Sequence, residues 1–386
     1  MKVFIWSPLI SEVGTTWTVI NTVKAINRYS RDKLFCYLID VANEWEDYKE
    51  EIRENNINLI KLGNKIDFKK LPKFGFIKSR ITYLIIFFSS IFKLHKLLKK
   101  EKPEYLFVHL ITPVPLFLLL FFNYNTKFIL RISGFPKLNF FRKYFWKLLN
   151  KKIYRVFSPS TYTKDILIKK KIFSQNIINV VNEPILDIQN IKKKQKTSTN
   201  KYLTADKEYV LSIGRLTKQK NFKFLINGFD KILKQDPKIN LLICGDGEEK
   251  KNLEKEIKRL DRNDNIHLIG YQKNIYPILH NAKFFVLTSE WEDPGFVLIE
   301  SMFSNTIILS SDCESGPLEL IKNFVNGYLY KKDDMEDFVK LFLKIYSLTK
   351  YENPEIKKIK FNAKKSIKKF TLFNYYKNLE KFLLNN

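Results

Sequence analysis

The sequence predicts an α/β protein built from two Rossmann-like domains that face a cleft, and three observations lead to this prediction. The chain has 386 residues, which is more than one hydrophobic core usually serves. Short apolar runs alternate with helical patterns along the chain, as in doubly wound parallel sheets. Asp187–Lys207 interrupts this alternation and loses all apolar periodicity, so it marks a linker between two domains.

The first domain, residues 1–186, is expected to begin directly with a strand, because Met1–Pro8 lacks the basic leader and the cleavage site of a signal peptide. Its expected strands are Val3–Trp6, Leu34–Ile39, Asn58–Ile60, Tyr105–Val108, Lys127–Ile132, Tyr154–Ser158 and Ile177–Val181. Its expected helices are Thr16–Tyr29, Glu44–Asn55, Ser79–Lys100, Phe140–Asn150 and Thr161–Lys170. Strands that are apolar throughout and alternate with helices favour a parallel sheet.

The second domain, residues 208–365, shows the same alternation. Its expected strands are Tyr209–Ile213, Ile239–Cys244, Ile266–Ile269, Phe284–Leu287, Thr306–Leu309 and Gly327–Tyr330, and its expected helices include Asn221–Lys234 and Glu248–Leu260. Residues 366–386 close the chain as a further helix. Three widely separated cysteines, Cys36, Cys244 and Cys313, predict neither a disulfide framework nor a zinc site, and they favour a reducing compartment.

The net charge of +28 indicates an anionic partner such as nucleic acid or a membrane surface, although an AT-rich genome would also produce abundant lysine. Lys61–Lys102 stands out, with twelve Lys/Arg, two acids and the apolar run Ile81–Phe92. This run is shorter than the roughly 20 residues of a spanning helix, so no transmembrane segment is expected. A basic, aromatic-rich helix is typical of a surface attracted to anionic lipid, and a core helix of the first domain is the alternative.

Two carboxylates follow the strand Phe284–Leu287. Glu292 lies on the loop after the strand, and Glu300 lies about two turns into the next helix, which Asn305 would end in the left-handed conformation. Eight helical steps span roughly 12 Å. This exceeds the ~5–10 Å between paired carboxylates that act on one glycosidic bond. The pair is better placed to accept hydrogen bonds from hydroxyls at two ends of a long ligand; two solvent-facing glutamates are the alternative.

Phosphate-binding features follow other strands of the same domain. Gly214 lets the backbone approach a ligand, Arg215 can grip phosphate oxygens, and Lys220 adds a charge near a helix N-terminus. Gly245 begins a glycine-rich turn. The loop that contains Ser315 also follows a strand, and it either binds a ligand or serves only to cap the next helix through Ser315. Because the carboxyl ends of parallel strands share one edge, these loops predict a nucleotide-binding face, and a nucleotide sugar fits its charges.

These motifs resemble those of the family 4 retaining glycosyltransferases, which have the GT-B fold. The resemblance rests on Gly214-Arg215-Leu…Lys220, on Gly245-Asp-Gly247, and on Glu292-Asp-Pro-Gly-Phe-Val-Leu-Ile-Glu300 followed by Ser-Asp-Cys-Glu-Ser-Gly-Pro. It is closest to bacterial members that build capsule, lipopolysaccharide or lipid-linked oligosaccharide. It implies two facing Rossmann-like domains, with the C-terminal helix crossing back to the first.

The resemblance also implies roles for residues of the second domain. Glu300 would bind the ribose, and Glu292 with Gly295 and Phe296 would hold the donor sugar. Arg215 and Lys220 would stabilise the departing diphosphate, in place of a metal. Asp293-Pro294 stands where relatives more often have Gly-Phe, and this departure bears on which sugar fits.

Further roles follow for residues that contact the donor. Gly14 matches the loop that approaches the phosphates, although relatives often have two glycines there. His109 matches a histidine near the donor sugar, and Tyr271 lies where relatives hold the base. Gly214 and Gly245 would let the backbone approach the donor. The expected catalytic residues are therefore Glu292, Arg215, Lys220 and His109.

We expect a retaining glycosyltransferase that requires neither a metal nor a cofactor. It would move a hexose or N-acetylhexosamine from a nucleotide diphosphate sugar to a lipid-linked, lipopolysaccharide or capsule glycan. The expected nucleotide of the donor is UDP. It would be a cytoplasmic, peripheral protein at the inner face of the cytoplasmic membrane, held there by Lys61–Lys102. The alternatives are a nucleotide-sugar epimerase on the same fold and a basic nucleic-acid-binding protein; no nucleic-acid module is recognisable, so nucleic acid is not an expected partner.

Overall fold

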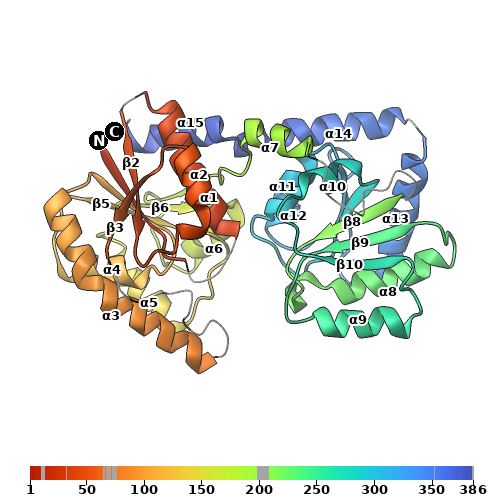
Figure 1. Cartoon of the computed structure of the whole chain (residues 1–386), viewed down its shortest axis with the longest axis horizontal. Coiled ribbons are helices and arrows are strands. Elements are labelled where there is room, and N and C mark those ends of the chain that lie inside the picture. Colours follow the sequence, from red (N-terminus) through yellow and green to blue (C-terminus); the bar gives the residue numbers. More distant parts are fainter. Residues whose placement is uncertain are drawn as a thin grey trace. The chain divides into compact units, whose positions relative to one another are not determined.

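The structure is a computed structural model that describes residues 1–9, 14–31, 33–63, 66, 71, 76–197, 208–351 and 353–384. The chain divides into two compact units (Figure 1). Unit 1 comprises Met1–Ile185 and Leu372–Asn386, and unit 2 comprises Leu186–Thr371. Each unit is built on its own parallel sheet, so the predicted pair of Rossmann-like folds is confirmed.

Unit 1 contains seven parallel strands in the order β3-β2-β1-β4-β5-β6-β7. The strands are β1 (Lys2–Trp6), β2 (Phe35–Asp40), β3 (Asn58–Lys61), β4 (Tyr105–Val108), β5 (Lys127–Arg131), β6 (Arg155–Ser158) and β7 (Ile178–Val180). The helices are α1 (Gly14–Tyr29), η1 (Glu46–Tyr48), α2 (Lys49–Glu54), α3 (Phe76–Glu101), α4 (Pro113–Phe121), α5 (Phe140–Leu149), α6 (Thr161–Lys169) and α15 (Leu372–Leu383). The strand order reverses between β1 and β4, which is the switch point where such sheets bind ligands.

Helices cover both faces of this sheet (Figure 1). Successive side chains of a strand point to opposite faces. Along β1, Val3 and Ile5 therefore belong to the core formed with α1, α2 and α15. Phe4 and Trp6 belong to the core formed with α3, α4 and α5. Burial on both faces explains why the strands of this domain are apolar throughout.

The C-terminal helix α15 belongs to unit 1, where it packs on α1. Arg131, at the end of β5, is buried and donates from Nη1 to the Tyr375 hydroxyl of α15 at 2.8 Å. Its Nε and Nη2 donate to the buried carboxylate of Glu183. Thr22 of α1 donates to the same tyrosine hydroxyl at 3.3 Å. Because the buried charge is paired and hydrogen-bonded, its burial is tolerated, and the network ties α15 to the sheet.

Unit 2 contains six parallel strands in the order β10-β9-β8-β11-β12-β13. The strands are β8 (Tyr209–Ile213), β9 (Asn240–Cys244), β10 (Ile266–Gly270), β11 (Phe284–Leu287), β12 (Ile307–Ser311) and β13 (Tyr328–Tyr330). The helices are α7 (Ile188–Gln195), η3 (Lys218–Lys220), α8 (Phe222–Leu233), α9 (Lys250–Arg259), α10 (Tyr276–Asn281), α11 (Phe296–Phe303), α12 (Gly316–Leu320), α13 (Met335–Thr349), α14 (Pro354–Ser366) and η4 (Ile367–Phe370).

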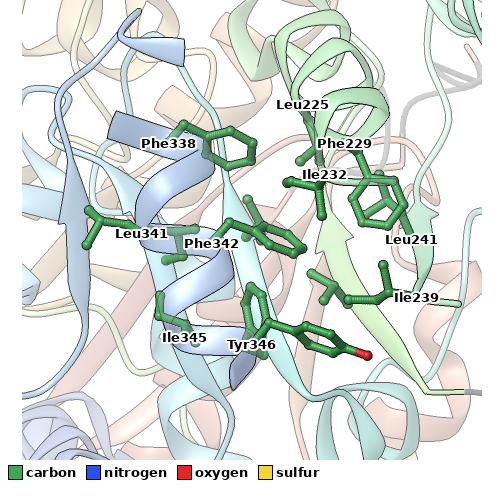
Figure 2. Packing of buried hydrophobic residues seen from close by; sticks show 14 of the residues in the cluster. Leu225, Phe229, Ile232, Ile239, Leu241, Phe338, Leu341, Phe342, Ile345 and Tyr346 are labelled. Carbon is green, nitrogen blue, oxygen red and sulfur yellow. The ribbon is translucent and has the colours of Figure 1, made fainter. Parts of the chain in front are cut away.

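The core of unit 2 combines aromatic and aliphatic side chains between α8 and α13 (Figure 2). Phe338 and Phe342 lie four residues apart on α13 and face α8, where Phe229 is fully buried. The ring of Phe342 lies 5.8 Å from that of Phe229 and 4.8 Å from that of Phe284 on β11. Helical spacing of large apolar residues thus fixes α13 against both a helix and a strand.

Helix α7 lies in the segment that the sequence pattern assigns to a linker. Its Ile191 is buried, and the helix packs on α10. A helix of this length is marginal in isolation, so the tertiary contact is what stabilises it. The pattern missed it because a single buried residue produces no periodicity. Residues 198–207 of the expected linker lie outside the described residues.

The chain returns to unit 1 later than residue 366. Helix α14 and the short η4 both belong to unit 2, and the returning segment begins at Leu372. Ile367 and Phe370 of η4 are buried, and η4 packs on α11. These two side chains hold the segment in unit 2.

The helix expected at Glu44–Asn55 also begins later. The Glu44 carboxylate accepts hydrogen bonds from the backbone N–H groups of Val41 and Ala42, at 3.0 and 2.6 Å. It therefore caps the loop after β2, and the regular helix α2 starts only at Lys49. Burial raises the pKa of Glu44 to about 8, with the neighbouring Asp40 adding to the rise.

Candidate active site

Four loops of unit 2 meet at one edge of its sheet. They follow β8, β9, β11 and β12, which are adjacent in the order β9-β8-β11-β12. All four strands are parallel, so their carboxyl ends lie on the same side. The residues that the sequence singled out after separate strands are therefore brought to a common edge.

The loops after β8 and β9 touch through their backbones. Gly214 N donates to Cys244 O at 3.0 Å, and Leu216 N donates to Asp246 O at 2.9 Å. Gly245 has a φ of +151°, and a Cβ there would lie 1.8 Å from the carbonyl oxygen of Gly214. The glycine is thus required for the two loops to approach each other. This packing explains Gly245 without a ligand.

Lys220 and Glu292 form a salt bridge across this edge. Both side chains are largely buried, with exposed fractions of 13% and 7%. Ser289 Oγ donates to the same carboxylate oxygen at 2.7 Å. Gly214 lies beneath the lysine, since a Cβ there would lie 3.1 Å from Lys220 Cδ. The sequence placed these two residues at different parts of a ligand, whereas the structure pairs them directly.

Further hydrogen bonds join the loops after β8 and β11. Gln219 donates from Nε2 to Trp291 O at 2.9 Å, and its own carbonyl accepts from Glu290 N at 2.8 Å. Asn221, which has a left-handed φ of 48°, donates to Glu290 Oε1 at 2.6 Å. Thr288 Oγ1 donates to the carbonyl of Lys220 at 3.0 Å. The lysine and the glutamate are therefore held by a rigid pair of loops.

The loop after β12 closes on the residues that follow Glu292. Gly316 N donates to Glu292 O at 3.0 Å, and a Cβ on Gly316 would lie 2.3 Å from Pro294 O. Ser315 Oγ donates to Asp293 Oδ1 at 2.9 Å. Ser315 precedes α12 as expected, but its hydroxyl does not cap that helix. The serine instead orients Asp293.

Gly295 and Phe296 begin α11. Gly295 has a φ of +81°, a conformation that glycine adopts without strain, and Phe296 is the first helical residue. Amides at a helix N-terminus face an approaching anion or hydroxyl. Asn305 follows the end of the helix with a φ of 67°, as the sequence predicts.

Glu300 lies on α11 beside α10 and α7. Its Oε1 accepts a hydrogen bond from the Tyr276 hydroxyl at 3.2 Å. Burial raises the pKa of Glu300 to about 7, while that hydrogen bond and the charge of Lys194 oppose the rise. Burial raises the pKa of Tyr276 as well. Sequence reasoning missed both neighbours, and the only signal for Lys194 was the basic run Lys192–Lys194.

Two expected donor-binding residues are exposed at this edge. Arg215 follows β8, and its guanidinium has no hydrogen-bond or ion-pair partner within the described part of the chain. Tyr271 follows β10 and is 64% exposed. Since β10 neighbours β9, Tyr271 extends the same edge. Both side chains are accessible to a ligand.

Unit 1 contains the other two expected residues, Gly14 and His109. They follow β1 and β4, which are neighbours in the sheet. Gly14 is exposed at the start of α1, and Ser11–Val13 before it lies outside the described residues. His109 is buried, and neither ring nitrogen has a hydrogen-bond partner among the described residues. Burial and the charge of Arg131 hold the pKa of His109 well below its usual value, so the ring is neutral.

Metal ligands do not gather in the part of the chain that the structure describes. No group of three or more His, Cys, Asp or Glu side chains there has the arrangement of a metal site. The charged groups that the sequence predicted at this edge are the cations Arg215 and Lys220 and the carboxylates Glu292 and Glu300.

The chain is similar to known proteins in sequence and in fold. Residues 193–366 match the family model described as glycosyl transferases group 1. A glycosyltransferase of Methanocaldococcus jannaschii is 30% identical over 250 residues, which cover 60% of this chain and 61% of the relative. The chain thus spans less than two thirds of the length of this relative.

Two further proteins are informative. The N-acetylgalactosamine-N,N'-diacetylbacillosaminyl-diphospho-undecaprenol 4-alpha-N-acetylgalactosaminyltransferase of Campylobacter jejuni is 32% identical over 149 residues, which cover 39% of each chain. The crystal structure of HepE from Anabaena, in complex with UDP and glucose, superposes with a TM-score of 0.72 at 16% identity, and 99% of each chain is covered. At that identity the likeness shows a shared GT-B fold.

Proposed function

Residues 193–366 form a domain of the glycosyl transferases group 1 family, and from this premise we propose that the protein is a retaining glycosyltransferase. It transfers a hexose or N-acetylhexosamine from a nucleotide diphosphate sugar, UDP-linked, to a glycan acceptor. The observation that carries the proposal is the Lys220–Glu292 pair at the same sheet edge as Arg215, which has no partner among the described residues. These residues provide two cations for a diphosphate and a carboxylate for a sugar hydroxyl at one sheet edge.

In this proposal the donor lies along the edge formed by β10, β9, β8 and β11. Arg215 and Lys220 bind the diphosphate, and the amides of Gly295 and Phe296 face the sugar. When Lys220 turns to the phosphate, Glu292 is released to accept a hydroxyl hydrogen bond. Glu300 accepts from the ribose at the opposite end.

The transfer itself needs no metal or cofactor in this proposal. The acceptor hydroxyl oxygen bonds to the anomeric carbon, the bond from that carbon to the diphosphate oxygen breaks, and the hydroxyl proton leaves on the diphosphate. Negative charge develops on the departing group, and Arg215 and Lys220 stabilise it there.

The acceptor is proposed to be carried on lipid. The printed name of the Campylobacter jejuni relative describes an acceptor linked to diphospho-undecaprenol, which supports this class. Lys61–Lys102, with twelve Lys/Arg and two acids, supports a peripheral position at the inner face of the cytoplasmic membrane.

The test replaces the three charged residues one at a time. Arg215→Ala is the cleanest change, because the side chain is exposed and unpartnered and its loss should leave the melting temperature unchanged. We expect its transfer rate to fall by about 10²–10³-fold, as for other groups that stabilise developing charge. Glu292→Gln and Lys220→Ala should also lose transfer, although each leaves a buried partner and should lower stability.

Glu256→Gln is the matched control, because this carboxylate is also little exposed, at 13%, and also pairs with a cation, Arg259, but within α9. It should retain full transfer. If both Arg215→Ala and Glu292→Gln transferred sugar at the wild-type rate, the proposal would be wrong. The epimerase alternative predicts a new sugar isomer from the UDP-sugar alone, and the relatives named above, which are glycosyltransferases, do not favour it.

A further inference from the structure

Helix α3 exposes a stripe of large apolar side chains. Leu84, Phe88 and Phe92 are spaced four residues apart, so they lie on one side of the helix. They are 56%, 67% and 74% exposed. The opposite side of α3 contributes Ile86 and Leu94 to the core of unit 1. The predicted apolar run Ile81–Phe92 therefore contributes both to the core and to the exposed surface.

The outward apolar surface continues onto α4 and α5. Phe121 of α4 is 62% exposed, and Phe140 and Phe141 at the start of α5 are 77% and 81% exposed. Tyr144 and Leu148 extend the same helix. We call these residues the aromatic face: Leu84, Phe88, Phe92, Phe121, Phe140, Phe141, Tyr144 and Leu148.

Ring contacts join the aromatic face between α3 and α4. The ring of Phe87 lies 5.4 Å from that of Phe88 and 5.3 Å from that of Phe117, which in turn lies 4.5 Å from Phe121. Helix α3 packs on α4, and α4 packs on α5. All three helices cover the same face of the sheet of unit 1 (Figure 1). Contiguous apolar surface of this kind marks an interaction site.

The positive charge of the chain is concentrated around these helices. Residues 68–164 contain 20 Lys/Arg and two acids, Glu101 and Glu104, whereas the other 289 residues contain 48 and 38. A genome bias acts on the whole chain and does not produce this contrast. Exposed cations flank the aromatic face on α3 (Lys96, Lys99 and Lys100) and on α5 (Arg142 and Lys147).

A helix that spans the bilayer does not account for this surface. Arg80–Glu101 is long and apolar enough to cross a membrane by length and composition, a test that core helices also pass. Its inner side is packed on the sheet through Ile86, Ile91, Leu94 and Leu98. The helix therefore lies along the domain and offers one side to a partner.

We propose that the aromatic face is a membrane-docking surface that inserts into an anionic bilayer. Its large apolar side chains enter the boundary between headgroups and acyl chains, to a depth of about 5–10 Å, and the flanking cations contact lipid phosphates. This extends the contact beyond Lys61–Lys102 to α4 and α5. It rests on the proposed function only in that docking brings the enzyme to a lipid-linked acceptor.

The test compares paired substitutions in the full chain. The test pair, Phe140→Ser with Phe141→Ser, removes two exposed side chains of α5. The control pair, Phe361→Ser with Leu318→Ser, removes two side chains of unit 2 that are 69% and 54% exposed. Binding is measured by flotation with phosphatidylcholine vesicles, with and without phosphatidylglycerol. The wild-type protein should float only with vesicles that contain phosphatidylglycerol. The α5 pair should bind these vesicles at least about tenfold more weakly, and the control pair should bind them as the wild type does.

Insertion depth has its own readout. Phe141→Trp and Phe361→Trp each add one indole at a comparable exposure, and brominated lipids quench fluorescence within the bilayer. We expect added quenching only in Phe141→Trp.

Three outcomes would overturn the proposal: no binding of wild type to phosphatidylglycerol vesicles, equal loss in both serine pairs, or equal binding to neutral vesicles. An oligomer that the α5 pair abolishes, without lipid binding, would assign the face to a second copy instead. Thermal stabilisation by UDP-sugar is measured in parallel, because it reports the donor site alone. If it persists while vesicle binding fails, the docking proposal and the peripheral membrane position both fall, and the proposed glycosyltransferase activity stands.

Discussion

Glu300 is a carboxyl group whose protonation state is set by its surroundings. Burial raises its pKa to about 7, from an ordinary value of 4.5. Between these two values the folded chain holds a proton that the unfolded chain has lost, so this group lowers stability as the pH rises through the range. A ribose diol, in contrast, is best bound by the ionised carboxylate, which only accepts hydrogen bonds.

Donor binding should therefore depend on pH near neutrality. As the pH falls from 8 to 6, Glu300 changes from mostly ionised to mostly protonated. Because only the ionised form binds the ribose well, the affinity for UDP-sugar should fall by roughly tenfold. Titration calorimetry at several pH values measures this change. In Glu300→Gln the affinity should be low and flat over the same range. A wild-type affinity that does not change between pH 6 and 8 would contradict a carboxylate–ribose contact.

The loop pairs are the elements that shape the candidate site. The loops after β8 and β9 approach so closely that glycine is needed at position 245. The loops after β11 and β12 approach through Gly316 in the same way. Since these contacts involve backbone atoms, neighbouring side chains cannot relieve them by changing rotamer. The sheet edge is therefore rigid before any ligand binds.

Gly245→Ala should destabilise unit 2 and weaken donor binding. The added Cβ would lie 1.8 Å from Gly214 O, and the φ of +151° disfavours a side chain. We expect a loss of about 1–3 kcal/mol in the free energy of unfolding, measured by urea titration.

Gly270→Ala is the matched control for Gly245→Ala. This glycine also has a positive φ, +71°, but no atom lies within 4 Å of the added Cβ. It should cost only about 1 kcal/mol and should spare donor binding. If the two variants behaved alike, the close contact of the two loops would not be what Gly245 maintains.

At the scale of the whole molecule, the chain runs through unit 1, then unit 2, and returns to unit 1 in α15. The return is secured by Arg131, which binds Glu183 and Tyr375 in the core. A buried charge with all its partners is stable, whereas loss of one partner leaves it undercompensated. The stability of unit 1 thus depends on the last residues of the chain.

Tyr375→Phe should lower the stability of unit 1 by about 1–3 kcal/mol, because Arg131 loses an acceptor in a buried site. Differential scanning calorimetry measures the change. Tyr376→Phe is the control, since among the described residues that hydroxyl bonds only with Glu380 of the same helix, at 3.2 Å, and its loss should cost less. Equal effects would show that the buried network does not hold α15.

The sequence by itself determined the two Rossmann-like folds and the sheet edge at which the polar loops meet. Strand and helix signals are local, and parallel strands necessarily share one edge. Tertiary structure alone decided that Lys220 pairs with Glu292, 72 residues away, and that Ser315 binds Asp293 rather than capping α12.

Tertiary structure also decided which apolar residues are core. The run Ile81–Phe92 looks uniform in sequence, yet Ile86 is buried and Phe88 is exposed. Helix α7 formed in a segment without periodicity, since it packs on α10 and its Ile191 is buried. Pairing and burial depend on residues distant in the chain, and a local pattern carries no information about which distant surface will cover it.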